Sequence, residues 1–280
     1  MNADDVAAHW ESNAETWTIY SRAGYDRYRD ALNTPAFLDM LPPVAGLRGL
    51  DLGCGEGSNT RAVARLGASM TGLDIAPTFI RYARETETQA PLGIDYVLGD
   101  GQSIDFPEAS FDFVTAFMSM MDMADQRQVL KGIHRVLKPG GFLQFSILHP
   151  CFVPPTRRNI RDENRKLIAV EIADYFDESE GRVERWIFSS IPEAERATLT
   201  PFAIPRFHRT LSTWVSMIVE AGLTIEAFGE PMASAASWRW PSQWSPTPAS
   251  RRSSCISGRA SRKAVLCRHH RRTATTELAR

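Results

Sequence analysis

The sequence contains few cysteines, the residues that form disulfides and bind structural zinc. Its 280 residues include only four cysteines, at positions 54, 151, 255 and 267. They lie far apart, which excludes the dense disulfide scaffold of a small secreted protein. Cys255, Cys267, His269 and His270 do not have the spacing of a zinc site, so no metal is expected.

The chain also lacks an apolar run of about eighteen residues, the length that a membrane-spanning helix needs. Residues 1–5, Met-Asn-Ala-Asp-Asp, do not begin a basic region followed by an apolar one, as a secretory signal would. Hydrophobic residues make up 43% of the chain, enough for a sizeable core. We therefore expect a soluble, cytoplasmic protein with no membrane partner, built as one large domain or one domain with additions.

Positive charge is scarce outside residues 251–280. That stretch holds nine of the 32 Lys and Arg residues and one of the 33 acids, so the rest of the chain carries 23 bases and 32 acids. An acidic body disfavours contact with a phosphate backbone. We therefore do not expect the main part of the chain to bind nucleic acid.

Glycine, in contrast, is concentrated in one turn. An apolar segment at 47–52 leads into Asp51-Leu-Gly53-Cys-Gly55-Glu-Gly57, and residues 58–66 have the pattern of a helix. Glycine permits positive φ and the close approach of a ligand, and the start of a helix offers free N–H groups. The strand, glycine turn and helix together predict a site for a nucleotide-type ligand.

The spacing of these glycines favours a ligand with a cationic group. A dinucleotide fingerprint, G-x-G-x-x-G, would place its third glycine at position 58, where this chain has Ser58. Asp51 also lies two residues before the first glycine, where it would repel a pyrophosphate. A nicotinamide-dependent oxidoreductase is therefore the disfavoured alternative.

Four motifs resemble, in their order, those of the class I S-adenosylmethionine-dependent methyltransferases. They are Asp51–Gly57, Thr71-Gly-Leu-Asp74-Ile, Gly99-Asp100-Gly101 and Leu137-Lys-Pro-Gly-Gly141. The chain is most similar to the small-molecule branch that includes the ubiquinone and menaquinone methyltransferases. The resemblance implies S-adenosyl-L-methionine as the cofactor and S-adenosyl-L-homocysteine as its product.

The same resemblance implies roles for individual residues. Asp74 would hold the ribose hydroxyls, Asp100 would accept a hydrogen bond from the adenine amine, and Asp51 would orient the turn and the cofactor's ammonium group. The residues expected around the cofactor are Asp51, Gly53, Cys54, Gly55, Gly57, Asp74, Ile75, Asp100, Gly101, Phe117 and Met118.

Strand and helix patterns alternate through the middle of the chain. Strands are expected at 47–52, 69–74, 94–98, 111–117 and 142–148, and helices at 58–66, 77–88 and 124–137. This alternation predicts a doubly wound, Rossmann-like α/β fold with a mostly parallel sheet of the seven-stranded type. The carboxyl ends of parallel strands meet at one edge, here called the rim, where ligands bind. Asp51, Asp74, Asp100 and His149 all belong to this rim.

Two additions are expected to cover the rim. Residues 1–46, with large side chains at helical spacing, predict an N-terminal helical cap, and residues 150–205 predict an inserted lid in which strands 168–176 and 183–189 form a hairpin. The side chains expected to reach the substrate are Tyr20, Tyr28, Met121, Tyr175 and Arg209. For the aromatic residues the alternative is plain packing.

The residues at the end of the fourth strand limit which classes of substrate are expected. Phe117-Met-Ser-Met-Met-Asp122 lacks the Asn- or Asp-Pro-Pro-aromatic motif of enzymes that methylate nucleic-acid bases, and the paired glutamates of arginine methyltransferases are not visible. An apolar, methionine-rich wall favours a small apolar or aromatic acceptor.

Two histidines are the candidate catalytic residues. His149 ends the fifth strand and His208 precedes a helix expected at 210–221. A neutral imidazole could take a proton from the acceptor. Because alignment of the reacting atoms supplies most of the rate in many methyl transfers, a purely structural role is the alternative for both.

Residues 206–232 supply the last helix and a strand at 223–229, and then the composition changes. The family has a final antiparallel strand between the fifth and the sixth, but residues 233–280, rich in Arg, Ser, Ala and Thr, supply no convincing one. The alternatives are a lost reading frame, an appended tail and a disordered basic extension. Without this strand the fifth strand would keep an unpaired edge in mid-sheet.

The sequence thus predicts a methyltransferase that acts on a small organic acceptor by in-line displacement, as a monomer or homodimer. A protein that binds the cofactor without catalysing transfer is the alternative. The expected parts are a cap at 1–46, a cofactor-binding core at 47–149, a lid at 150–205, the last helix and strand at 206–232 and an atypical tail at 233–280.

Overall fold

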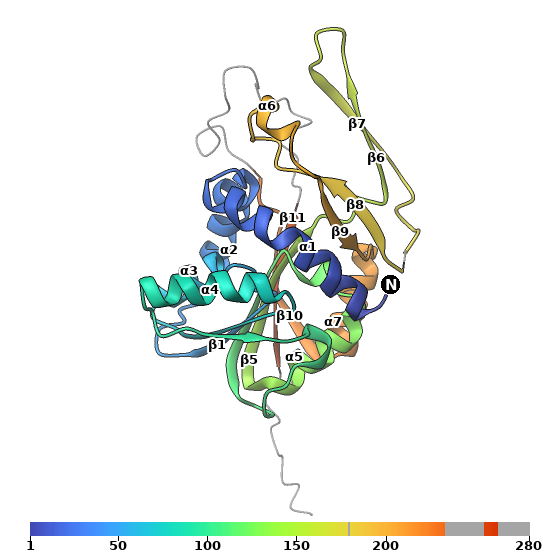
Figure 1. The fold of residues 1–280 in the computed structure, drawn as a ribbon. Helices are drawn as coiled ribbons and strands as arrows, with labels where there is room; N and C mark the ends of the chain where they lie inside the picture. Colours follow the sequence, from blue (N-terminus) through green and yellow to red (C-terminus); the bar gives the residue numbers. More distant parts are fainter. Residues whose placement is uncertain (179, 233–254, 263–280) are drawn as a thin grey trace, which may run out of the picture.

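The computed structural model describes residues 1–178, 180–232 and 255–262. Seven strands form a central sheet in the order β10-β11-β5-β4-β1-β2-β3 (Figure 1). Their bounds are β1 Arg48–Leu52, β2 Ser69–Asp74, β3 Asp95–Leu98, β4 Phe111–Phe117, β5 Leu137–Leu148, β10 Leu223–Gly229 and β11 Cys255–Arg262. Five neighbouring strands of this sheet, β5-β4-β1-β2-β3, pair in parallel. Strand β11 pairs antiparallel with both its neighbours, β10 and β5. The predicted Rossmann-like α/β fold is confirmed.

Helices cover both faces of the sheet. On one face, α2 (Thr34–Met40), α3 (Ser58–Ala64) and α4 (Pro77–Gln89) contribute Phe37, Val63 and Ile80 to a buried apolar cluster. On the other, α5 (Gln126–Val136) and α7 (Leu211–Glu220) contribute Leu130 and Trp214 to a second cluster. The strands are apolar on both sides because both sides are buried. Short 3₁₀ turns, η2 (Gly101–Ser103) and η3 (Met120–Asp122), follow β3 and β4 at the rim.

Strand β11 corrects the expectation that the last strand is missing. It pairs with residues 142–148 of β5 on one side and with β10 on the other, so β5 has no unpaired edge there. The sequence Cys-Ile-Ser-Gly-Arg-Ala-Ser-Arg shows no apolar alternation, so its pattern did not reveal the strand. Pairing on both sides satisfies its backbone without that pattern. The other residues of the tail, 233–254 and 263–280, lie outside the described residues, and the three explanations for its composition stay predictions.

The N-terminal cap bridges the core and the lid. It consists of α1 (Ala3–Arg22), the π-helix η1 (Arg29–Asn33) and α2. Helix α1 begins at a capping box, in which the Asn2 side chain accepts from the Asp5 N–H and the Asp5 side chain accepts from the Asn2 N–H. Figure 1 shows α1 crossing between α4 and the lid strands. Trp10 packs near Phe79 of α4, at 6.1 Å between ring centroids.

The lid contains two separate strand pairs instead of the predicted hairpin. Strand β6 (Thr156–Arg161) pairs with β7 (Leu167–Ala173), and β8 (Arg182–Trp186) pairs with β9 (Phe202–Arg206); α6 (Glu193–Arg196) lies between β8 and β9 in the chain. Strands occur close to both predicted positions, but they do not pair with each other. The polar sequence of β6, Thr-Arg-Arg-Asn-Ile-Arg, lies in solvent on both faces and therefore lacks the alternation of a half-buried strand.

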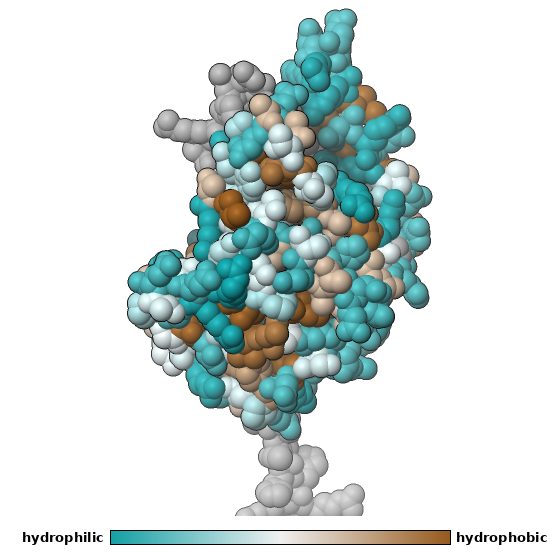
Figure 2. Space-filling view, viewed as in Figure 1, coloured by the Kyte–Doolittle hydropathy of each residue, from teal (hydrophilic) through white to brown (hydrophobic). Residues whose placement is uncertain are grey.

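The β6–β7 pair projects from the body of the molecule (Figure 1), and its tip is hydrophilic in the space-filling view (Figure 2). Its turn is closed by Asp162, whose Oδ1 accepts from the backbone N–H groups of Asn164 at 3.0 Å and Lys166 at 2.8 Å. This is local turn chemistry that the sequence pattern alone did not resolve. Within the described residues, no helix has the length and apolar character needed to span a bilayer.

Candidate active site

The glycine turn lies between β1 and α3, at the rim of the sheet. Gly53 has φ 71°, and a Cβ there would lie 2.4 Å from the Cβ of Ser119, so a larger residue does not fit. Ser119 is fixed in place because its hydroxyl donates to the Leu52 carbonyl at 2.6 Å. Gly55 has φ 56°, but no atom lies within 4 Å of the position of its Cβ. The turn is therefore closed toward β4 at Gly53 and open at Gly55.

Asp51, in β1, is buried below this turn. One carboxylate oxygen accepts from the Thr60 hydroxyl at 2.6 Å and the other from the Thr115 hydroxyl at 2.9 Å. Burial raises the pKa of Asp51 to about 6, although both hydrogen bonds oppose the shift. Asp51 thus connects β1 with the start of α3 and with β4, and its role in orienting the turn stays a prediction.

Asp74 ends β2 on the other side of the turn. Its Oδ2 accepts from the Gly55 N–H at 2.8 Å and its Oδ1 from the Ala76 N–H at 2.9 Å. Burial raises the pKa of Asp74 to about 6, against the effect of these two bonds. A hydrogen bond from the Ile75 N–H also opposes the rise in this pKa. Two buried carboxyl groups, Asp51 and Asp74, therefore flank the glycine turn and make the site attractive to a cation.

The remaining residues predicted around the cofactor lie at the same rim. Burial raises the pKa of the Cys54 thiol, which is therefore a neutral packing group beside Tyr96. Gly57 caps the start of α3 with φ 89°, and Ile75, partly buried, follows Asp74.

Asp100 and Gly101 form the loop after β3. Asp100 is partly buried, and its Oδ1 accepts from the Gln102 N–H at 2.9 Å. Gly101 is buried, and a Cβ there would lie 3.0 Å from the sulfur of Met123 and 3.3 Å from a methyl carbon of Leu52. The predicted adenine loop thus packs next to the end of β1.

Phe117 ends β4 and Met118 follows it, and the cap helix α2 packs on Phe117. The ring of Phe117 stacks on that of Phe37 in α2, at 3.7 Å between centroids. Met118 has φ 53°, and its N–H donates to the Ser146 carbonyl of β5 at 3.0 Å. Positive φ at a non-glycine residue is a strained conformation that functional sites often hold.

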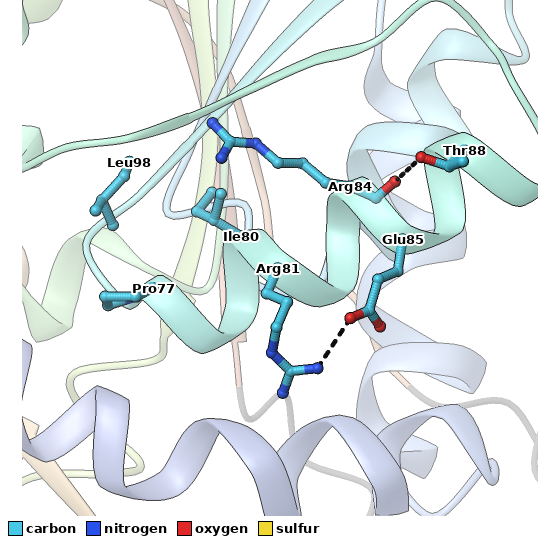
Figure 3. A pocket seen from close by; sticks show the side chains of 7 residues that line it. All are labelled: Pro77, Ile80, Arg81, Arg84, Glu85, Thr88 and Leu98. Carbon is cyan, nitrogen blue, oxygen red and sulfur yellow. Dashed lines mark hydrogen bonds and ion pairs between the residues drawn. The ribbon is translucent and has the colours of Figure 1, made fainter.

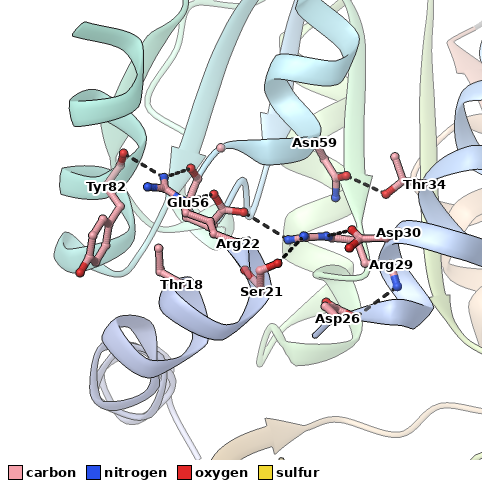
Figure 4. A network of polar contacts seen from close by, with 12 residues as sticks. Thr18, Ser21, Arg22, Asp26, Arg29, Asp30, Thr34, Glu56, Asn59 and Tyr82 are labelled. Atoms are coloured by element: carbon pink, nitrogen blue, oxygen red, sulfur yellow. Dashed lines mark hydrogen bonds and ion pairs between the residues drawn. The ribbon is translucent and has the colours of Figure 1, made fainter. Parts of the chain in front are cut away.

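An ionic network that no sequence pattern predicted joins the cap to the glycine turn (Figure 4). Glu56, between Gly55 and Gly57, has a side chain only 6% exposed and binds Arg22 of α1 at 3.0 Å and Arg29 of η1 at 3.2 Å. Arg22 also donates to the carbonyl of Glu56 at 3.2 Å and to that of Tyr82 in α4 at 3.1 Å. The partners are more than twenty residues apart in sequence, so no local pattern indicated the contact.

His149 has both ring nitrogens occupied. The Cys151 N–H donates to Nδ1 at 3.2 Å, so the proton of the neutral ring lies on Nε2, which donates to the Glu230 carboxylate at 2.6 Å. The ring is 3% exposed and packs on Phe152. This arrangement orients the end of β5 and offers no free lone pair to an acceptor.

His208 lies beside Tyr175, another predicted site residue. Its Nε2 donates to the Tyr175 carbonyl at 2.8 Å, which leaves Nδ1 as the basic nitrogen of the neutral ring. The Tyr175 hydroxyl accepts from the Leu211 N–H at the start of α7, at 2.9 Å. Arg209 donates to the His208 carbonyl at 2.7 Å, and burial lowers the pKa of its guanidinium. These three residues form one group between the lid and α7.

The other residues predicted to reach the substrate do not gather at one point. The Tyr20 hydroxyl donates to Glu195 of α6 at 2.8 Å, and Tyr28 is 52% exposed. Met121 is buried in η3, and its carbonyl accepts from the Phe207 N–H at 3.0 Å. Among these residues only Met121 lies in the rim next to β4, while Tyr20 links the cap to the lid.

A buried ion pair attaches the lid to the rim beside Met121. Asp122 of η3 binds Arg206 of β9 at 2.7 Å, and Glu184 of β8 lies 3.5 Å from the same guanidinium. Burial raises the pKa of Asp122 to about 7; the Arg206 charge opposes this rise and the Glu184 charge adds to it. Asp122 was predicted only as part of the wall that follows the fourth strand, and no sequence pattern indicated Arg206 as its partner.

A surface groove of about 370 Å³ borders the rim from outside, along α4 and the end of β3 (Figure 3). Arg84 in its wall donates to the Tyr96 carbonyl at 3.0 and 2.6 Å, and Arg81 pairs with Glu85 at 3.0 Å. Because these two arginines are already bound to other groups, the groove is a weaker candidate for a ligand site than the glycine turn. No group of three or more metal-binding side chains occurs within 1–178, 180–232 and 255–262.

Comparison with known proteins agrees with this geometry. Residues 50–145 match a family described as a methyltransferase domain. The chain is 35% identical over 167 residues to a demethylmenaquinone methyltransferase of Tropheryma whipplei, covering 55% of this chain and 68% of the relative. It is 35% identical over 123 residues to a ubiquinone biosynthesis O-methyltransferase of Xanthomonas oryzae, covering 42% of this chain and about half, 51%, of that relative.

A solved structure shares the fold over most of the chain. The putative S-adenosylmethionine-dependent methyltransferase of Listeria monocytogenes superposes with a TM-score of 0.66 at 22% identity, covering 82% of this chain and 96% of the other. The match extends well beyond residues 50–145, so it includes elements outside the cofactor-binding core.

Proposed function

Because the chain belongs to the class I S-adenosylmethionine-dependent methyltransferases, we propose that it methylates a small aromatic acceptor of the quinol type. Membership establishes the cofactor, S-adenosylmethionine, and disfavours the nicotinamide alternative. Two relatives are named as a demethylmenaquinone methyltransferase and a ubiquinone biosynthesis O-methyltransferase, and these names support a quinol-type acceptor.

One observation carries the proposal most directly: two buried carboxyl groups face a glycine turn that is open at Gly55. Asp51 and Asp74 would repel a pyrophosphate and attract the positive charges of S-adenosylmethionine. When bound, the cofactor supplies a methyl group activated by a sulfonium sulfur, and the acceptor loses a proton as the carbon–sulfur bond breaks.

We assign the cofactor contacts accordingly. The Asp74 carboxylate would accept from the ribose hydroxyls, while Asp51, held by Thr60 and Thr115, would fix the turn and favour the ammonium group. Asp100 would accept from the adenine amine, next to Gly101. Cys54 and Phe117, which belong to one apolar cluster, together with Ile75 and Met118, would supply apolar contacts around the cofactor.

The acceptor would lie against the end of β4, where Met118 packs against the apolar cluster that contains Met121. Flexible methionine side chains suit an aromatic ring of variable substitution. Of the two histidines, His208 is the better general base, since its Nδ1 keeps the basic lone pair while both nitrogens of His149 are used. Tyr175 and Arg209 orient His208 in this proposal.

A methyl-transfer assay tests the proposed function. Purified protein would be mixed with methyl-labelled S-adenosylmethionine and, in parallel, a demethylmenaquinol, a catechol with a short isoprenoid chain and an aliphatic amine. We expect label in the first or second and none in the amine. Tight cofactor binding without transfer to either aromatic acceptor would favour the alternative of a non-catalytic binding protein.

The finer expectations from the sequence stay predictions. They are the cytoplasmic location, the monomeric or homodimeric state and the division of roles among cap, core and lid.

A further inference from the structure

Asn33, in the π-helix of the cap, has a buried side chain with no hydrogen-bond partner. It is 4% exposed, and neither its Nδ2 nor its Oδ1 forms a hydrogen bond. Asn13 provides the contrast within the described chain: it is 5% exposed, and its amide donates to the Ala203 carbonyl and accepts from the Ala203 N–H, both at 3.0 Å. Buried amides are normally paired as Asn13 is, so Asn33 requires an explanation.

The neighbours of Asn33 place it at the rim, between the glycine turn and β4. The next residue, Thr34, donates to the Asn59 side chain in the first turn of α3, at 2.8 Å. One helical turn later Phe37 stacks on Phe117 at the end of β4, and its carbonyl accepts from the Gln144 side chain of β5 at 2.6 Å.

The direction of the chain refines this position. Helix α2 ends at Met40, shortly before β1 begins at the edge of the sheet opposite the rim. The helix therefore descends away from the rim, so Asn33 lies nearer the rim than Phe37. Both residues are buried and four positions apart, which puts them on the same helix face.

The local backbone adds a second, independent observation. Residues 29–33 form a π-helix, a rare conformation that is found often at functional sites. Arg29, at its start, is anchored by Glu56 of the glycine turn and by the Ser21 carbonyl at 3.1 Å, which fixes the segment against the turn. An unpaired buried amide costs free energy, and here it lies in a π-helical segment, so both features point to a binding residue and not to packing.

We propose that the Asn33 carboxamide binds the α-amino acid end of S-adenosylmethionine, an inference that rests on the proposed function. That end carries one ammonium and one carboxylate. The two unpaired atoms match this pair, since Oδ1 accepts from the ammonium and Nδ2 donates to the carboxylate. A neutral amide can hydrogen-bond to both charged groups, whereas an aspartate at this position would repel the carboxylate of the cofactor. The cap thereby binds the α-amino acid end of the cofactor, which an ordinary nucleoside lacks.

Three proteins test this inference: wild type, Asn33→Leu and Asn33→Asp. Calorimetric titration would use S-adenosylhomocysteine and 5′-methylthioadenosine, which lacks the amino-acid end. We expect Asn33→Leu to bind S-adenosylhomocysteine about 10- to 100-fold more weakly and 5′-methylthioadenosine within about 3-fold of wild type. Asn33→Asp should also lose affinity for S-adenosylhomocysteine alone.

Urea unfolding of the ligand-free proteins separates binding from packing. Replacing an unpaired buried amide by an apolar group of similar shape should leave the midpoint unchanged or raise it for Asn33→Leu. The matched control, Asn13→Leu, removes an amide with two partners and should lower the midpoint. A role in packing predicts instead that both variants lose stability.

The outcomes distinguish this inference from the proposed function. Wild type that fails to bind S-adenosylhomocysteine contradicts the proposed function itself. Wild-type binding that Asn33→Leu retains in full, or a loss that extends equally to 5′-methylthioadenosine, overturns the role of Asn33 alone. A ligand-free Asn33→Leu protein that is less stable than wild type, or does not fold, also overturns it.

Discussion

The buried ion pair between Asp122 and Arg206 joins the rim to the lid, and we expect the variant Arg206→Met to lose stability in a pH-dependent manner. Both side chains are at most 10% exposed, so removing the guanidinium leaves the carboxyl of Asp122 without its cation. A buried carboxyl responds by keeping its proton, which raises its pKa further. The loss therefore depends on whether the wild-type carboxyl is ionised.

The magnitude follows from the pKa of Asp122, which burial raises to about 7 in the wild type. At about pH 5 this carboxyl is protonated in both proteins, and the variant loses only a hydrogen bond and some packing, ~1–2 kcal/mol. At about pH 9 the wild-type carboxyl is ionised, so the loss grows by roughly 3 kcal/mol if the variant stays protonated.

Urea unfolding of wild type and Arg206→Met at these two pH values is the assay. Arg81→Met is the control, because Arg81 forms exposed pairs with Glu15 and Glu85 and should show little loss at either pH. A loss for Arg206→Met that is the same at low and high pH would refute the reasoning, since it would mean that the charge of Asp122 does not contribute to the attachment of the lid.

Three further predictions concern the rim and the cap. The free energy of unfolding should fall as pH rises from about 4 to about 7, because the unfolded carboxyls of Asp51, Asp74 and Asp122 release their protons near pH 4 while burial raises the folded pKa values to about 6, 6 and 7; urea titrations across this range that show rising stability would contradict it. Gly53→Ala should lower the free energy of unfolding, measured with urea, by at least about 2 kcal/mol, because the new Cβ would overlap Ser119. Gly46→Ala, at φ 77° with open space around it, should lower this free energy by only about 1 kcal/mol. Equal losses would show that the contact with Ser119 is unimportant. Glu56→Gln removes the negative charge that binds both Arg22 and Arg29. It should therefore speed amide hydrogen exchange at the end of α1 and in η1 and weaken S-adenosylmethionine binding about 3- to 10-fold. Exchange that stays unchanged, as expected for the exposed control Glu85→Gln, would argue against Glu56 as the residue that anchors the cap.

Sequence patterns were sufficient for the part of the fold in which local chemistry determines structure. The glycine turn at 53–57, the buried strands β1, β2 and β4 and the helices between them all agree with the expected positions within a few residues. Apolar periodicity and glycine spacing are local signals, and burial on both faces of a parallel sheet makes them strong. The grouping of Asp51 and Asp74 at one rim followed from the topology alone.

The parts that sequence patterns did not reveal depend on contacts between distant segments. Strand β11 carries few apolar residues and is specified by the two strand edges on either side of it. Strand β6 is polar because both its faces lie in solvent. The Glu56 contacts with Arg22 and Arg29 and the Asp122–Arg206 pair join residues that no periodic pattern relates. Asn33 gave no signal because an unpaired amide is visible only once its surroundings are known.

The measurement that tests the central claim most directly is a calorimetric titration of S-adenosylmethionine into the full chain and into Asp74→Asn, with NADH as the competing ligand. We predict a dissociation constant on the order of micromolar for the wild type, a loss of about 10-fold or more for Asp74→Asn, and no binding of NADH. A folded wild type that binds NADH but not S-adenosylmethionine, or an Asp74→Asn protein that binds S-adenosylmethionine as tightly as wild type, would contradict the account.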